Sequence, residues 1–221
     1  MPIHKYFVKE NVKKAEIDEF LSNELKSAGY SRVELTKTPL GTRVVIYASK
    51  PGMVIGRRGQ SIRDLSKILE ERFGVENPQI SVAPIEVPEL DPRIIASQIA
   101  SALQKGIHFR RAAYWAIQRV MSAGASGVEI VISGKLTTER ARYEKYRAGY
   151  LPRVGDHVSK QVKTGVAVTQ LKPGLYGVKV TIVPPNIKLP DKPEIKQSII
   201  ESQSLKEFKE ESEKVADTEK T

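Results

Sequence analysis

The densest group of residues that could do chemistry is a short loop in which two glycines enclose two arginines. Its members are Gly56, Arg57, Arg58, Gly59 and the following Gln60. Glycine has no Cβ, so such a loop can turn tightly and let a phosphate backbone approach closely. Arginine adds charged, forked donors that match phosphate oxygens. The loop is a candidate phosphate site, and the alternative is an ordinary corner between two helices.

The segments around this loop have a definite order. Residues 12–28 and 61–73 carry apolar side chains at helical spacing, and residues 31–38, 42–48 and 79–83 have strand patterns. Ser61 and Asp64 have capping-box spacing, which places the start of the second helix directly after the loop. The positive N-terminal end of its dipole would then face the loop. In this context the loop resembles that of the KH domain, in the prokaryotic type II arrangement (α-β-β-α-α-β). Such loops clamp about four nucleotides of single strand.

A second group begins at Phe109-Arg-Arg-Ala-Ala-Tyr-Trp-Ala-Ile-Gln-Arg. On a helix, a buried stripe would consist of Phe109, Ala113, Ala116, Ile117 and Val120. Arg111, Tyr114 and Gln118 would share another face, with Arg110 beside Tyr114. The alternative is a solvated amphipathic face, but no acidic residue occurs between Asp91 and Glu129. A helix selected only for solubility normally carries both signs of charge, so Arg110, Arg111 and Tyr114 are candidate RNA contacts.

A third group interleaves cations with tyrosines in a strand-like segment. Its candidate RNA contacts are Arg140, Arg142, Tyr143, Lys145, Tyr146, Arg147 and Arg153, with Tyr150 beside them. Cations can meet phosphates while tyrosines stack on unpaired bases or bond sugar hydroxyls. The alternative is an edge hairpin that uses its charges against aggregation. Five cations exceed what that role requires, so the pattern favours RNA contact.

Charge and proline patterns divide the chain. The 221 residues hold 36 basic and 26 acidic side chains, and 15 basic against only 5 acidic ones fall within residues 91–184. We expect a KH domain at 1–84, a linker at 85–91 and a basic domain at 92–184, followed by a charged, largely disordered tail at 185–221. Helical patterns at 92–105 and 109–123 precede strand patterns at 128–133, 140–148, 160–170 and 176–183. The predicted fold class is α+β, with helices on one face of an antiparallel sheet.

Several function classes are disfavoured. The chain has no cysteine, and its histidines (His4, His108 and His157) lack ligand-like spacing. No window of about 18 apolar residues suggests a membrane span, and the first residues have no signal-like apolar core. We therefore expect no metal or other cofactor, no membrane contact, no small-molecule substrate and no catalytic role.

The groups together resemble a particular family. The segments VIGRRGQ, FRRAAYWAIQRVMSAGASGVEI, VISGKL and YGVKVTIVPP are similar to those of the third protein of the small ribosomal subunit, over residues 10–185. The short N-terminus and Tyr114 are closer to its archaeal and eukaryotic branch. The resemblance implies rRNA contacts in the subunit head, chiefly through the basic domain. It implies a position beside the point where mRNA enters, with the tenth and fourteenth small-subunit proteins as neighbours. It also implies a cytoplasmic, ribosome-bound protein.

One position departs from the bacterial pattern. Bacterial members carry an Arg-Arg-x-x-Lys cluster associated with gripping or unwinding mRNA, and here Arg110 and Arg111 match it while Tyr114 replaces the lysine. We expect contact with mRNA through the two arginines, but we do not expect full unwinding activity.

Two alternative functions remain. One is a free KH-type RNA chaperone or assembly factor, although the chain has no P-loop motif. The other is a DNA lyase or nuclease.

Overall fold

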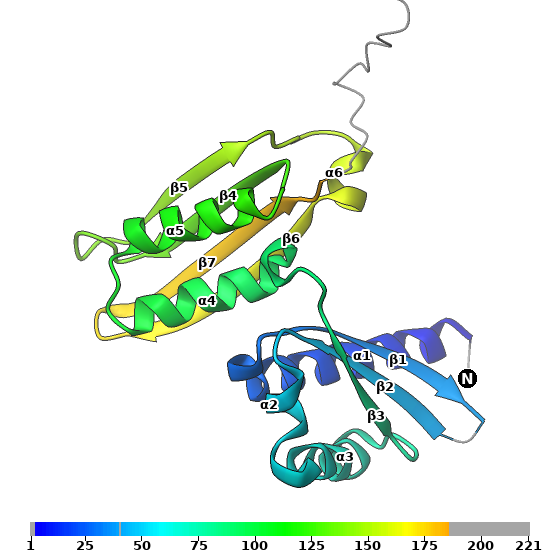
Figure 1. The fold of residues 1–221 in the computed structure, drawn as a ribbon. Helices are drawn as coiled ribbons and strands as arrows, with labels where there is room; N and C mark the ends of the chain where they lie inside the picture. The colour runs from blue at the N-terminus through cyan, green and yellow to red at the C-terminus, as the bar shows by residue number, and fades with distance from the viewer. Residues whose placement is uncertain (1–2, 40, 186–221) are drawn as a thin grey trace, which may run out of the picture. The chain divides into compact units, whose positions relative to one another are not determined.

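The computed structural model describes residues 3–39 and 41–185, and it begins with a small α+β domain (Figure 1). The elements of this domain are α1 (Ile3–Glu24), η1 (Lys26–Ala28), β1 (Tyr30–Thr38), β2 (Gly41–Ala48), α2 (Pro51–Ile55), η2 (Arg57–Gly59), α3 (Gln60–Phe73) and β3 (Gln79–Pro84). The strand order is β1-β2-β3, with β1 antiparallel and β3 parallel to the central β2. The predicted order of helices and strands is confirmed.

The core of this domain forms where helices cover the central strand. Val44 and Ile46 of β2 are fully buried, and they cluster with side chains of α1 and α3, among them Leu21 and Leu69. Each such side chain contributes about 1.5–3 kcal/mol on burial. Val54 of α2 is buried in the same cluster. Helices α2 and α3, on the two sides of the glycine–arginine loop, are therefore both anchored in the core.

The second domain has two layers. After η3 (Pro88–Leu90) come α4 (Pro92–Gln104), α5 (Phe109–Ser122), β4 (Gly127–Gly134), β5 (Arg142–Gly149), α6 (Asp156–Gln161), β6 (Lys163–Leu171) and β7 (Gly174–Val183). The strands form an antiparallel sheet in the order β5-β4-β7-β6. Helices α4 and α5 lie against one face of it (Figure 1), as the sequence predicted. Among the described helices, none has the length and apolar character needed to cross a membrane.

The register of the sheet decides which side chains meet the helices. Ile130 of β4 pairs with Val180 of β7, and Ile132 pairs with Val178; all four are fully buried under α4 and α5. The alternate residues point to the opposite face, which those helices leave open. There Val166 of β6 is 63% exposed. Tyr143, Lys145 and Arg147 of β5 share this open face because strand side chains alternate.

Three local predictions were wrong. Helix α1 begins at Ile3, not at residue 12. Its first turns could not be predicted, because they project beyond the core and carry no apolar periodicity. In this part of the helix, Lys37 of β1 donates to Glu10. Helix α6, with an ion pair from Lys160 to Asp156, occupies the start of the strand predicted at 160–170. A six-residue helix is too short to show a period. Ser61 does not cap α3, whose N-cap is Gly59.

The predicted borders at residues 84 and 92 remain predictions, although β3 ends at Pro84 and α4 begins at Pro92. The predicted tail lies outside the described residues except for Pro185.

A polar cluster links α1 and β1 to the start of α4. Arg93 donates from Nη1 and Nη2 to the Asp18 carboxylate, at 3.0 Å each, and from Nη1 to the Ser31 carbonyl at 2.9 Å. Tyr30 also donates to Asp18, and Ser31 donates to Asp91, which caps α4. Burial opposes ionisation of Asp18, but the bonds from Arg93 and Tyr30 outweigh it and hold its pKa below the usual range.

This lowered pKa predicts an acid-sensitive contribution to stability. A carboxylate whose pKa is depressed on folding stabilises the protein above its unfolded pKa of about 4, and the contribution disappears as pH falls through the folded value. Because the pair is partly exposed, we expect about 1 kcal/mol at neutral pH. Urea denaturation of the wild type and of Asp18→Asn should show that difference near neutral pH and convergence in acid. A constant difference across this pH range would contradict the prediction.

Candidate nucleic-acid interface

The glycine–arginine loop has a backbone that only particular residues can adopt. Gly56 has φ 72° and ψ −177°, and a Cβ there would lie 2.1 Å from the Ser61 hydroxyl oxygen. Arg58 has φ 54° and ψ 27°, in the left-handed region. The chain therefore reverses between α2 and α3 in a turn held by Gly56, and Ser61 packs against that glycine where the sequence suggested a cap.

The loop presents its charges outward. Arg57, Arg58 and Gln60 are exposed, and within the described residues neither arginine pairs with a carboxylate. No side chain caps the N-terminus of α3, so its first amides stay available to an anion. One exposed site therefore combines two uncompensated arginines, a helix N-terminus and a glycine turn. This combination suits phosphate binding.

Helix α5 directs its two predicted arginines to different sides. The predicted buried stripe is confirmed, with Ala113 and Ala116 fully buried. Arg110 approaches Glu144 of β5, with 3.4 Å between Nη2 and Oε1. Arg111, in contrast, lines a groove between α5, α4 and η1. Tyr114 is 63% exposed and meets the ring of Tyr146 edge-on at 5.4 Å.

Strand β5 separates the third predicted group between its two faces. Tyr143, Lys145 and Arg147 lie on the open face, and Lys145 sits over the Tyr143 ring at 5.2 Å. Tyr146 faces the helices and donates to Glu144. Burial and this bond raise the pKa of Tyr146 to about 12. The Tyr146 hydroxyl proton is therefore engaged in the hydrogen bond to Glu144.

Two cations of this group are partly neutralised. The Glu129 Oε1 atom accepts from Arg147 Nε at 2.9 Å and from Arg153 Nη2 at 3.1 Å, and the Glu129 side chain is only 14% exposed. Arg140, in the loop before β5, and Arg142 are exposed and form no ion pair within the described residues. Arg140, Arg142 and Lys145 therefore keep the most uncompensated charge here.

The structure joins part of the second group to the helix-facing side of β5. Tyr143, Lys145 and Arg147 lie on the other face of the sheet, and within the described part of the chain the loop is connected to neither. The contacts from Arg110 to Glu144 and from Tyr114 to Tyr146 join α5 to β5. No hydrogen bond or ion pair among the described residues connects Arg57 or Arg58 to them. The candidate interface thus has two parts, the loop of the first domain and the α5–β5 surface of the second.

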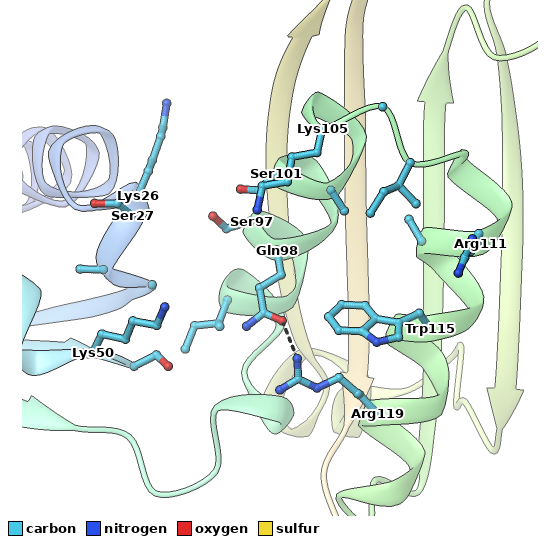
Figure 2. A pocket seen from close by; sticks show the side chains of 18 of the residues that line it. Lys26, Ser27, Lys50, Ser97, Gln98, Ser101, Lys105, Arg111, Trp115 and Arg119 are labelled. Atoms are coloured by element: carbon cyan, nitrogen blue, oxygen red, sulfur yellow. Dashed lines mark hydrogen bonds between the residues drawn. The ribbon is translucent and has the colours of Figure 1, made fainter.

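Sequence reasoning missed a further set of residues, which lines the groove beside Arg111. Trp115, at 46% exposure, contributes to this groove of about 990 Å³ together with Lys26, Lys50, Lys105 and Arg119 (Figure 2). The available signal was a tryptophan next to Tyr114 in a helix with cations on both sides. Lys26 and Lys50 could not be found this way, because they are distant from Trp115 in the sequence.

The fold and the exposed loop define this chain as a KH-domain protein, a class that binds single-stranded nucleic acid. A family model described as KH domain matches residues 16–90, and one described as ribosomal protein S3, C-terminal domain, matches residues 99–182. The chain belongs to the ribosomal protein S3 family. These matches confirm the predicted family and the predicted fold class.

Relatives of high identity cover most of the chain. A protein of Methanocaldococcus jannaschii is 51% identical over 88% of this chain and 94% of its own length. One of Saccharolobus solfataricus is 49% identical over 89% and 85%, and one of Methanobrevibacter smithii is 48% identical over 94% and 84%. Each is named small ribosomal subunit protein uS3. These names support the expectation of a non-enzymatic protein, since they denote a subunit component and no catalyst.

Proposed function

We propose that the chain is a structural component of the small ribosomal subunit, where it binds rRNA in the head and helps form the site at which mRNA enters. The observation that carries this proposal is the uncompensated positive charge on both sides of β5. Arg140, Arg142 and Lys145 are exposed around β5, in a domain with 15 basic and 5 acidic residues. Phosphate neutralisation with counterion release would supply most of the binding free energy.

The two parts of the interface suit different RNA partners. The α5–β5 surface is broad and rich in cations, which favours contact with the folded rRNA backbone. The loop around Arg57 and Arg58 has the small, glycine-lined form that suits one strand. Arg110 and Arg111 lie at the exposed start of α5 and would meet mRNA, with Tyr114 beside them. The tenth and fourteenth small-subunit proteins are the proposed neighbours, and the cytoplasm is the proposed compartment.

Sedimentation of the tagged chain in a lysate of an archaeal relative tests the assembly. We expect it in the small-subunit fractions of a sucrose gradient, with release at high salt because counterion release governs RNA affinity. A chain that binds RNA but stays outside those fractions would favour a free RNA chaperone.

Subunits assembled with Arg110→Glu and Arg111→Glu should initiate poorly on structured mRNA, and unchanged initiation would contradict the mRNA role.

A further inference from the structure

The groove around Trp115 has walls from four separate segments. Trp115 and Arg119 project from α5, and Lys105 is the C-cap residue that follows α4 (Figure 2). Lys26 of η1 and Lys50, from the turn before α2, come from the opposite wall (Figure 2). We call this space the Trp115 groove. It contains Arg111 but none of the other residues that the sequence predicted to contact RNA.

Trp115 is held as a flat exposed platform. The Arg119 guanidinium lies 4.9 Å from the centre of its ring, and Arg119 is itself fixed by Glu89 at 2.8 Å and Gln98 at 3.4 Å. Held against Arg119, the ring loses little further freedom when a ligand binds. An indole that is 46% exposed, with its orientation already set, is suited to stack on an unpaired base.

The charge of the groove has one sign. Its charged lining residues are all cations: Lys26, Lys50, Lys105, Arg111 and Arg119. Only Arg119 forms an ion pair with a carboxylate among the described residues. The other polar side chains of the lining are Gln98, His108 and four serines, Ser27, Ser49, Ser97 and Ser101. Such a lining would attract a polyanion, and hydroxyl groups can bond to ribose oxygens.

We propose that the Trp115 groove binds a segment of single-stranded RNA, with one base stacked on Trp115 and the flanking phosphates held by Lys50 and Lys105. This inference rests on the proposed function, and it adds a third RNA site to the loop and the α5–β5 surface. A protein partner fits less well. Protein interfaces are enriched in tryptophan and arginine but depleted of lysine, and this groove presents three lysines and no carboxylate.

The emission of Trp115 tests the proposal directly, because it is the only tryptophan of the chain. Titration of the full chain with a short oligouridylate should quench this emission. The quenching curve should coincide with the binding curve that is measured by the anisotropy of the end-labelled oligonucleotide. Trp115→Ala should weaken binding by about tenfold, since one base stack is lost. Trp115→Phe, which keeps an aromatic ring, should retain most of the affinity.

A matched pair of charge variants separates the groove from general attraction. Lys50→Ser with Lys105→Ser should weaken binding and reduce quenching. Lys163→Ser with Lys172→Ser removes the same charge from exposed positions outside the groove, and it should have a smaller effect. All these residues are exposed, so the melting temperatures should agree with that of the wild type.

Three results would overturn the proposal. Oligouridylate binding that leaves Trp115 emission and the Trp115→Ala affinity unchanged would place the RNA elsewhere, and the proposed function would stand. Equal effects of the two lysine pairs would show general electrostatic attraction only. An oligoglutamate peptide that quenches as strongly as the oligouridylate would make the groove a protein site. Loss of the proposed function itself would show instead as absence from the small-subunit fractions.

Discussion

Changing Arg57 and Arg58 together to aspartate is expected to weaken binding of single-stranded RNA on the order of a hundredfold. Each arginine is exposed and without a carboxylate partner within the described residues, so both are free for phosphate. A hydrogen bond to a charged group contributes about 1.5–3 kcal/mol, and two such bonds at the lower value give about 3 kcal/mol, a factor of about 150. The slope of log affinity against log salt should become shallower by about 1.4. Anisotropy titrations at several salt concentrations measure both effects.

The same change should leave the fold intact. Arg58 has a left-handed backbone at φ 54°, a conformation that aspartate adopts more readily than most residues. Carboxylates near the N-terminus of α3 also interact favourably with the helix dipole. The control is Lys163→Asp with Lys172→Asp, which alters the charge equally at exposed positions away from the loop. A fall in melting temperature that accounts for the loss of binding, or equal losses in both variants, would refute the loop as a binding site.

Gly165→Ala should be among the most destabilising single substitutions in the second domain. Gly165 of β6 lies under the start of α4, where a Cβ would come within 2.4 Å of the Pro92 carbonyl carbon and 2.5 Å of the Arg93 nitrogen. Both atoms belong to the backbone and cannot rotate away, so α4 would have to shift. Overpacking of this kind costs about 1–3 kcal/mol, which corresponds to a melting temperature roughly 2–12 °C lower in a chain of this size.

Gly52→Ala is the matched control for this prediction. Gly52 is exposed in α2, and an added Cβ would meet nothing within 4 Å. Alanine also favours a helix over glycine, so stability should be unchanged or slightly higher. Calorimetry on both variants gives the comparison. If the melting temperature of Gly165→Ala equals that of the wild type, the close approach of α4 to β6 is not required for the fold.

The acidic residues of the second domain bear on the nuclease alternative. Such an enzyme would need carboxylates grouped for a metal ion. Here Asp91 caps α4, Glu129 holds Arg147 and Arg153, and Glu144 accepts from Tyr146 and Arg110. Each of the three carboxylates therefore has a structural role. This agrees with the chain's place in the ribosomal protein S3 family.

The order of elements was predictable from the sequence because each depends on a local pattern. The buried stripe of α5 follows from apolar residues at helical spacing, and the alternation in 128–133 and 176–183 follows from strand geometry. The errors lie where that pattern is lacking. Helix α1 extends to Ile3 without apolar periodicity, and α6 has only six residues. The Ser61 capping box failed because the side chain packs against Gly56.

The chemistry of the candidate site was only partly predictable. The types and spacing of Gly56, Arg57, Arg58 and Gly59 predicted a loop that the structure shows to be exposed. Nothing in the sequence indicated that Glu129 would pair with two of the cations expected to contact RNA. Tyr146 was expected to be a stacking residue, yet the register of β5 turns it toward α5.

By itself, the sequence determined the family, the α+β class and the concentration of positive charge in residues 91–184. Spacing and composition suffice for these properties, because they belong to segments and not to contacts. Only the tertiary structure decided which cations stay uncompensated, since that depends on where Glu129 and Glu144 lie in the folded sheet. It alone also brought Lys26 and Lys50 to the groove of Trp115. Residues so distant in the chain become neighbours only when the domains have packed.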